Sequence, residues 1–385
     1  MMIKIMEINN LDHNKVWLMR EAMGPYYVFF ERTIEQQAMF YSQIHAYHIE
    51  NHTLQPYVFD SNVQLISEGN YAGILYFASL HKDANGSSFV ISKLILDGFI
   101  KEDIISIPLH IDINLDIYTL RSSLVSIDER YCLFFLPNKN FSFNANFYSE
   151  VLLIDSSQKT SYSLSMNSTT YSDVLLNLSE CKIGNKGNTI VFKAGRINSF
   201  EKRAQWKKSN NDYTSEALLV LDKTDFVTSV MNKSDASPLM NTKFEGNETI
   251  GIIGKGSETL IYFKENFEED ITEVYSIQLA SGKTVSKFQI DEHFSSIVAY
   301  SDRLYGAKEN TKNGHYSYLS FADQKTHVLG SDVLVYLDEN VTITARPHHI
   351  GSFNLKIKMT NMIENKLFTD KKYLYDFERN TLIIY

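Results

Sequence analysis

The sequence contains few residues that cross-link a chain or force it to turn. It has two cysteines, Cys132 and Cys181, which are too few for a disulfide framework. Cys132 lies inside an apolar run, so we expect it to be a small buried side chain rather than a reactive thiol. Only 6 prolines and 17 glycines are present among 385 residues. Asn, Asp and Ser must therefore form most of the turns, through hydrogen bonds from the side chain to the local backbone.

Long apolar runs and clustered positive charge are also missing. No run approaches the roughly 20 apolar residues that a membrane helix needs, and Lys4 and Glu7 interrupt the start, where a signal peptide would be apolar. The formal net charge is −9, and the scattered Lys and Arg disfavour a broad nucleic-acid surface. The sequence thus predicts a soluble, cytoplasmic protein, or a secreted one if a signal peptide has been removed, with no nucleic-acid and no membrane partner.

The abundant residues favour β-strands. The chain has 24 Phe and 23 Tyr, and hydrophobic residues make up 44% of it, enough for a large core of pleated strands. Some runs alternate with a period of two, as in 275–279, and others are continuously apolar, as in 151–154. No convincing helical pattern exceeds two turns, and 31–40 is the one segment in which a short helix is considered.

A two-part pattern returns seven times, roughly every 55 residues. The first part is a short apolar run that ends in an aromatic residue in its five strongest copies, and it lies at 27–30, 74–77, 132–135, 190–192 and 260–263, with weaker copies at 304–305 and 355–357. The second part is a strand, a tight polar turn and another strand, centred on Glu50, Asp97, Asp155, Asp222, Ala280, Asp323 and Glu378. A recurring interval of this kind indicates a structural repeat.

The repeat resembles the seven-bladed β-propeller architecture over nearly the whole chain. The fold that this resemblance implies is all-β, a single domain of four-stranded antiparallel blades, at approximately 9–60, 61–110, 111–166, 167–232, 233–291, 292–330 and 331–385. An open solenoid is the other way to stack such units, but neither end of the chain looks like the capping unit that a solenoid needs. Residues 2–8 could add a strand to an edge, and the sequence leaves the mode of ring closure open.

No particular propeller family can be named. The units lack a closing Trp-Asp dipeptide, a double-glycine kelch signature and the aspartate box of sialidases. No catalytic residue can therefore be carried over, because a fold does not imply a function.

Local motifs for catalysis or metal binding have simpler explanations. Gly282-Lys283-Thr284 precedes a strand instead of the helix that a phosphate-binding loop requires, so it reads as a hairpin turn. His45 and His48 are three apart on a predicted strand and point to opposite faces. We predict no metal site and no cofactor, and we read the repeated aspartates as turn residues that bond their own backbone.

One connection has a composition suited to binding. We label the four strands of each unit A to D in chain order. In an up-and-down meander the A–B and C–D connections, which include the tight turns, lie on one rim, and the B–C and D–A connections lie on the other, where loops can carry function. The B–C connection 194–215 is longer than its counterparts. Its candidate binding residues are Arg196, Arg203, Trp206 and Lys207, and Trp and Arg are enriched at binding hot spots. A solvated loop without a partner is the simpler alternative. The next B–C connection, 264–272, is acidic.

The leading hypothesis is a scaffold that binds a protein or peptide, or a small molecule, on the B–C/D–A rim with 194–215 as the contact loop. The alternative is a hydrolase or lyase with a polar site at the axial channel. Its candidate residues are Arg20, His110, Arg121 and His293. A weaker alternative is carbohydrate binding by exposed Tyr and Trp side chains.

Overall fold

The computed structural model describes a set of strands and one helix, with their turns. The described residues are 4–7, 16–18, 24–35, 38–67, 73–84, 86–109, 123–136, 150–164, 177–183, 188–195, 216–234, 236, 239–244, 248–255, 259–266, 269–281, 283–291, 294, 296–300, 303–310, 315–320, 325–330, 333–337, 341–349, 352–359, 373–376 and 381–384. The chain forms two compact units. One comprises Met1–Arg32, Gln43–Val58 and Phe294–Tyr385, and the other comprises Thr33–Ser42 and Phe59–His293.

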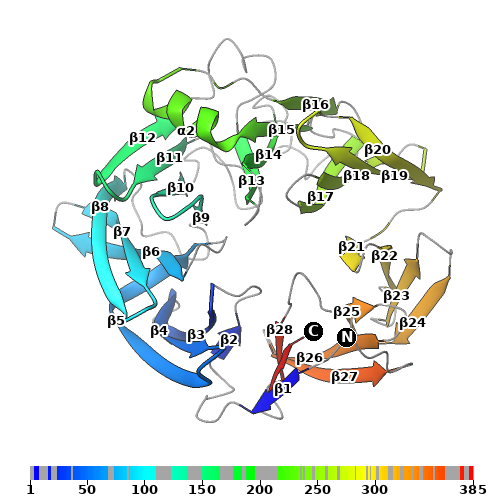
Figure 1. The fold of residues 1–385 in the computed structure, drawn as a ribbon, viewed down its shortest axis with the longest axis horizontal. Helices are drawn as coiled ribbons and strands as arrows, with labels where there is room; N and C mark the ends of the chain where they lie inside the picture. Colours follow the sequence, from blue (N-terminus) through cyan, green and yellow to red (C-terminus); the bar gives the residue numbers. More distant parts are fainter. Residues whose placement is uncertain are drawn as a thin grey trace. The chain divides into compact units, whose positions relative to one another are not determined.

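Four sheets of the described chain are four-stranded meanders, in which each strand pairs with the next (Figure 1). They are β9 (Ser123–Ser126), β10 (Tyr131–Leu136), β11 (Glu150–Asp155) and β12 (Thr160–Leu164); β13 (Asn177–Ile183), β14 (Thr189–Gly195), β15 (Glu216–Asp222) and β16 (Met240–Phe244); β17 (Glu248–Lys255), β18 (Thr259–Asn266), β19 (Ile271–Gln278) and β20 (Thr284–Ile290); and β21 (Ser296–Tyr300), β22 (Arg303–Asn310), β23 (His315–Ser320) and β24 (Thr326–Gly330). Within each of these sheets the pairing is antiparallel.

Three further sheets depart from four strands. The largest has the order β2 (Val16–Leu18), β3 (Tyr26–Glu35), β4 (Ala38–His48), β5 (Thr53–Ile66), β6 (Ile74–Asp83), β7 (Gly86–Ile95) and β8 (Ile100–Leu109). A second consists of β25 (Val333–Leu337), β26 (Val341–His349) and β27 (Ser352–Met359), and a third of β1 (Lys4–Glu7), β29 (Thr381–Ile384) and β28 (Tyr373–Asp376). The fold is thus built almost entirely of antiparallel β-strands, as predicted.

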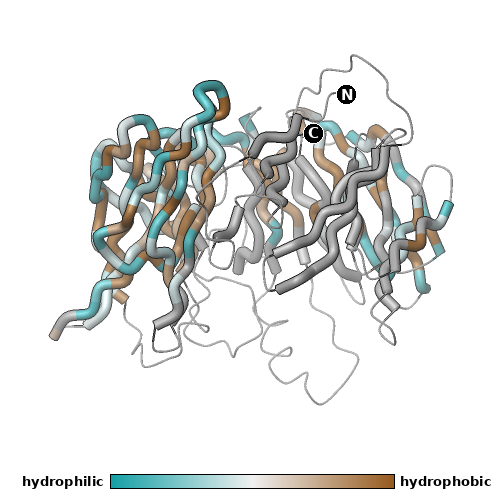
Figure 2. Tube along the Cα trace, turned by 90° about the horizontal axis from the view of Figure 1, so that it is seen from below, coloured by the Kyte–Doolittle hydropathy of each residue, from teal (hydrophilic) through white to brown (hydrophobic). Residues whose placement is uncertain are grey.

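The aromatic-ended runs form the buried strands. Tyr27, Phe77, Phe134 and Phe192 are all fully buried, and they lie in β3, β6, β10 and β14. Figure 2 shows hydrophobic residues recurring along the described strands, with hydrophilic residues at several of the turns. A buried aromatic side chain removes a large apolar surface from water. This explains why aromatic residues recur at the buried strand of each repeat.

The structure differs from the sequence-based expectation at several places. The described residues 31–35 belong to β3 and 38–40 to β4, so neither part forms a helix, and the β-branched Thr33 and Ile34 favour a strand. The boundary predicted between the first two units, at 60–61, falls inside one continuous strand, β5. The predicted seventh unit, 331–385, contributes strands to two sheets, and one of these also contains β1, so 4–7 does add to an edge, at β29.

A helix, α2 (Lys223–Met231), follows Asp222, where the sequence predicted a tight turn. The Asp222 carboxylate caps it by accepting hydrogen bonds from the backbone N–H groups of Thr224 at 2.9 Å and Asp225 at 3.0 Å. Phe226, Val227 and Val230 are buried on one side of this helix. Such short helices depend on tertiary packing for their stability.

Gly251 in β17 tests how closely the strands pack. It lies opposite Phe263 of β18, and a Cβ added at Gly251 would lie 2.2 Å from the Phe263 ring. Gly251→Ala is therefore expected to lower the free energy of unfolding by about 1–3 kcal/mol, because the ring must move. Chemical denaturation should also show that Gly251→Ala costs much less in a Phe263→Leu background. An equal cost in both backgrounds would exclude the ring as the cause.

Candidate functional site

The eight residues that the sequence marked as candidates for binding or catalysis lie outside the described residues. They are Arg20, His110, Arg121, Arg196, Arg203, Trp206, Lys207 and His293. Their roles stay predictions. The described strands do show where the connection containing four of them is attached, and they reveal a polar network that the sequence did not predict.

The two ends of the β9–β12 and β13–β16 sheets are different. At one end, which we call the turn end, short connections follow Asp128 and Asp155, and α2 follows Asp222. At the other end, the loop end, β10 and β11 close at the Leu136–Glu150 pair, and β14 and β15 close at the Gly195–Glu216 pair. The intervening segments 137–149 and 196–215 are much longer than the corresponding 267–270 and 311–314 of the next two sheets.

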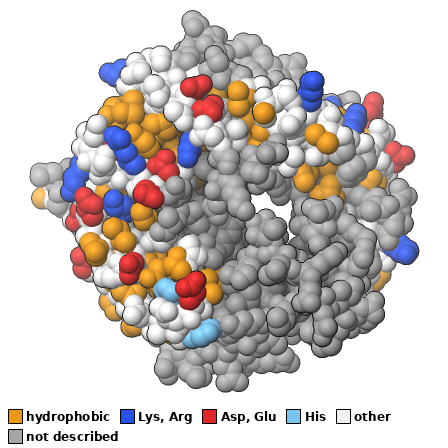
Figure 3. Space-filling model, viewed as in Figure 1, with side chains coloured by type: hydrophobic (Ala, Val, Ile, Leu, Met, Phe, Trp, Pro, Cys, Tyr) orange, Lys and Arg blue, Asp and Glu red, His pale blue; other side chains and the backbone are white. Residues whose placement is uncertain are grey.

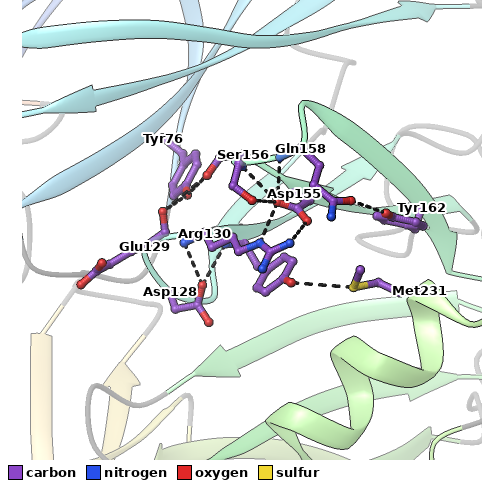
Figure 4. A network of polar contacts seen from close by, with 11 residues as sticks. Tyr76, Asp128, Glu129, Arg130, Asp155, Ser156, Gln158, Tyr162 and Met231 are labelled. Atoms are coloured by element: carbon purple, nitrogen blue, oxygen red, sulfur yellow. Dashed lines mark hydrogen bonds and ion pairs between the residues drawn. The ribbon is translucent and has the colours of Figure 1, made fainter.

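The turn end is organised around Asp155, whose side chain is 0% exposed (Figure 4). Its carboxylate accepts hydrogen bonds from Nε of Arg130 at 2.9 Å and Nη2 at 2.6 Å. It also accepts from the backbone N–H groups of Ser157 at 3.0 Å and Gln158 at 3.2 Å, and from the Ser157 hydroxyl at 2.8 Å. The prediction that this aspartate bonds its own turn is confirmed, and its pairing with Arg130 is an additional finding.

Hydrogen bonds determine the charge state of this pair. Burial acts to raise the pKa of Asp155, but the hydrogen bonds from Arg130 and from the Ser157–Gln158 turn outweigh it and lower the pKa to about 2. The hydrogen bond to Asp155 raises the pKa of Arg130 above its ordinary value. The carboxylate and the guanidinium are therefore both charged at neutral pH, and each neutralises the other.

Contacts from the same end reach the neighbouring strands on both sides (Figure 4). Tyr76 of β6 donates to the carbonyl of Glu129 at 2.8 Å and lies 3.3 Å from the Ser156 hydroxyl. On the other side, Lys223 of α2 lies 3.9 Å from Asp128. Through these polar contacts the turn end of the β9–β12 sheet is connected to β6 on one side and to α2, which follows β15, on the other.

Helix α2 seals the core beneath this network. The ring centroids of Phe226 and Phe192 of β14 lie 5.4 Å apart with the rings tilted by 52°, and Phe226 belongs to a buried cluster with Phe135 and Leu153 of the β9–β12 sheet. The Tyr131 hydroxyl lies 3.7 Å from the Met231 sulfur. The helix therefore packs across two sheets, and the turn end is a structural part of the molecule.

The face in Figure 3 carries both signs of charge, with Lys and Arg side chains interspersed among Asp and Glu over the described residues. Lys101 contacts Asp60 at 2.8 Å and Asp103 at 3.3 Å, and Lys93 contacts Glu102 at 3.5 Å. Within the β2–β8 sheet these charges are therefore paired with one another.

A second polar cluster lies on the β17–β20 sheet. Tyr262 and Tyr275 stack with ring centroids 5.0 Å apart, and Glu273 accepts from the Tyr275 hydroxyl at 2.7 Å and contacts Lys287 at 2.6 Å. Burial raises the pKa of Tyr262 to about 12. Tyr262 is only 5% exposed, so this aromatic pair is no platform for a sugar ring.

A third cluster pairs His45 of β4 with Glu31 of β3. His45 Nε2 lies 3.5 Å from a Glu31 carboxylate oxygen and 3.3 Å from the Gln43 amide nitrogen, which also bonds Glu31. His45 is buried, and the three side chains satisfy one another. The described residues contain no group of three or more His, Cys, Asp or Glu side chains arranged to hold a metal ion.

Cys132 is fully buried in β10, as predicted, and burial raises the pKa of its thiol. In the part of the chain that the structure describes, no helix has the length and apolar character needed to span a membrane.

Comparison with known proteins identifies structures of similar fold, but it identifies no family. No protein-family model and no curated protein matches the sequence. A prolyl endopeptidase structure resembles the chain with a TM-score of 0.52 at 8% identity, covering 97% of this chain and 50% of that one. The beta-propeller domain of the trilobed protease from Pyrococcus furiosus matches with a TM-score of 0.48 at 10% identity, covering 91% of this chain and all of that one. An oligogalacturonate lyase from Vibrio parahaemolyticus matches with a TM-score of 0.48 at 9% identity, covering 94% and 98%.

These identities support a likeness of fold alone. The chain spans half the length of the prolyl endopeptidase that it resembles. One of these similar structures is a beta-propeller domain. The repeated antiparallel sheets of the described residues agree with the predicted propeller architecture.

Proposed function

We propose that this protein is a β-propeller scaffold that binds a protein or peptide partner at the loop end of its sheets, with 196–215 as the principal contact. The observation that carries the proposal is the contrast between the two ends of the β13–β16 sheet. At the turn end, Asp222 and Lys223 contact other residues of the chain. At the loop end, Gly195–Glu216 is the last pair of the β14–β15 ladder. The long, basic segment 196–215 connects these two residues.

The composition of this segment suits recognition. Residues 196–215 contain five Lys or Arg residues against Glu201 and Asp212, together with Trp206, Phe200 and Tyr213. Aromatic and Arg side chains provide most of the binding energy at protein interfaces, since they combine large contact area with directional bonds. A rigid sheet that presents a long connection is the usual support for such a binding loop.

The number of blades is part of the proposal. The sequence predicted seven, but the seven-stranded sheet contains the first two predicted units, and 331–385 supplies strands to two sheets. We therefore propose eight repeated modules, with β28, β29 and β1 in the last of them. An experimental structure with seven modules would contradict this proposal and support the seven blades that the sequence predicted.

Replacing 202–208 with a Gly/Ser segment of equal length tests the binding function. Peptides selected from a random library on the intact protein should lose binding to this variant at least tenfold by fluorescence anisotropy, because the basic residues and Trp206 are gone. The melting temperature should stay within a degree or two, since the ladder from Thr189–Asp222 to Gly195–Glu216 is intact. If the selected peptides bind both proteins equally, the segment is not the contact.

The hydrolase or lyase alternative stays a prediction, because its candidate residues all lie outside the described chain. It requires converging ionisable groups at the axis, where innermost strands would meet. Alanine substitution of His110 and His293 together would leave peptide binding unchanged under our proposal.

A further inference from the structure

A buried hydroxyl in β9 has no hydrogen-bond partner among the described residues. It belongs to Ser126, which is 3% exposed. Buried polar groups of native proteins nearly always have a partner, which is either another group of the protein or an ordered water molecule. A serine hydroxyl donates one hydrogen bond and accepts up to two. The Ser126 hydroxyl therefore indicates a ligand that supplies these bonds.

The strand register determines what surrounds this hydroxyl. Side chains of a strand alternate between its two faces. Leu124 packs in the buried cluster that contains Tyr76 and Cys132, whereas Val125 packs in the cluster on the other face. Ser126 shares the face of Leu124, and it pairs directly with Cys132 of β10, so the hydroxyl and the thiol are neighbours. The strand that carries Tyr76, β6, also lies next to β9.

The Tyr76 hydroxyl brings an acceptor to the same buried region. Tyr76 is fully buried, and its hydroxyl donates to the carbonyl of Glu129 at 2.8 Å and lies 3.3 Å from the Ser156 hydroxyl (Figure 4). Ser156 is itself only 2% exposed. Because the one proton of the Tyr76 hydroxyl goes to the carbonyl, its oxygen keeps the capacity to accept a hydrogen bond. A donor from β9 and an acceptor from β6 thus face one enclosed region.

We propose that a single internal water molecule binds between β6 and β9, where it accepts a hydrogen bond from the Ser126 hydroxyl and donates one to the Tyr76 oxygen. The Cys132 thiol lies beside it as a weak further partner. Internal water molecules typically make about three hydrogen bonds to buried polar groups, which matches this set. The site is separate from the loop end and goes beyond the proposed binding function.

Water fits this site better than an ion does. The Ser126 and Tyr76 hydroxyls are neutral, and burial raises the pKa of the Cys132 thiol, so that the thiol is neutral as well. An ion at a fully enclosed position requires charged partners, because its loss of hydration is otherwise uncompensated.

Ser126→Ala tests the site by the sign of its effect in urea denaturation. If the water is bound, the substitution removes one of its hydrogen bonds, and the equilibrium constant for unfolding should rise about fivefold. If the hydroxyl is buried without a partner, its removal relieves a desolvation penalty, and the same constant should fall. A fall would overturn the proposal.

Ser92→Ala is the matched control. Ser92 of β7 is 1% exposed, and its hydroxyl donates to Asp103 at 2.7 Å. Its substitution removes a hydrogen bond within the chain and should also raise the unfolding constant. An effect of Ser126→Ala with the opposite sign to that of Ser92→Ala would show that the Ser126 hydroxyl has no ligand.

Two further measurements test whether the water joins Ser126 to Tyr76. Tyr76→Phe should raise the unfolding constant less in the Ser126→Ala background than in the wild type, by about twofold or more, because both substitutions remove hydrogen bonds of the same water. Additive effects would overturn the bridge. A crystal structure of the wild type should show a water within hydrogen-bond distance of both oxygens, and clear density without one would overturn the site itself.

Discussion

Asp155→Ala is expected to lower the free energy of unfolding by about 3 kcal/mol or more, measured by urea denaturation at pH 7. The carboxylate is fully buried and accepts five hydrogen bonds, two from Arg130 and three from its own turn. Its removal takes the acceptor away from Arg130, Ser157 and Gln158 and leaves an unfilled space at a fully buried position. The loss of a charged partner adds to the effect.

Asp97 provides the control for this substitution. It occupies the same place in the sequence repeat but is exposed, so Asp97→Ala should change the unfolding free energy by no more than about 0.5 kcal/mol. Equal effects at the two positions would mean that the turn, and not the buried pairing with Arg130, determines the stability.

The pH dependence gives a second measure of the same pair. The pKa of Asp155 is about 2 in the folded chain against an ordinary value of 3.8, so the carboxylate contributes stability above about pH 4 that is lost as the pH falls toward 2. The stability difference between the wild type and Asp155→Asn should shrink over this interval. A difference that is constant from pH 5 to pH 2 would contradict the lowered pKa.

Phe226→Ala is expected to cost about 3–4 kcal/mol, the range for truncation of a buried aromatic side chain. Phe226 is 2% exposed and contacts Phe192 across the interface between α2 and β14. The loss would show that α2 belongs to the core shared by two sheets.

Thr228→Ala is the matched variant on the exposed side of the same helix. It should be neutral or slightly stabilising, because Ala has the higher helix propensity. If Phe226→Ala lowers the free energy of unfolding no more than Thr228→Ala does, the helix does not contribute to the core. The packing between the β9–β12 and β13–β16 sheets must then depend on contacts between their strands alone.

The regular part of the fold could be predicted from the sequence because it depends on local signals. The runs ending in Phe30, Phe77 and Phe135 form buried strands, and the Asp155 turn is held by bonds within four residues. Such features are encoded in adjacent residues, so composition and spacing reveal them.

The parts that were missed depend on contacts between distant residues. Arg130 and Asp155 are 25 residues apart, and Tyr76 and Glu129 are 53 apart, so no local pattern indicates their pairing. Helix α2 has three Val or Thr residues in its middle, which lowers its intrinsic propensity, and its burial against another sheet determines the outcome. The end of the repeat was misjudged because strands of 331–385 join two sheets, one of them with β1.

The ladder between β14 and β15 has an evolutionary consequence. Seven consecutive pairs, from Thr189–Asp222 to Gly195–Glu216, hold this hairpin whatever sequence connects its tips. Doubling the length of such a connection adds only about 0.6 kcal/mol of closure entropy. Lengthening the connection thus costs little closure entropy, so under the proposed binding function its specificity could change in the course of evolution while the supporting hairpin stays the same. The same site would accept a grafted epitope or a reporter peptide.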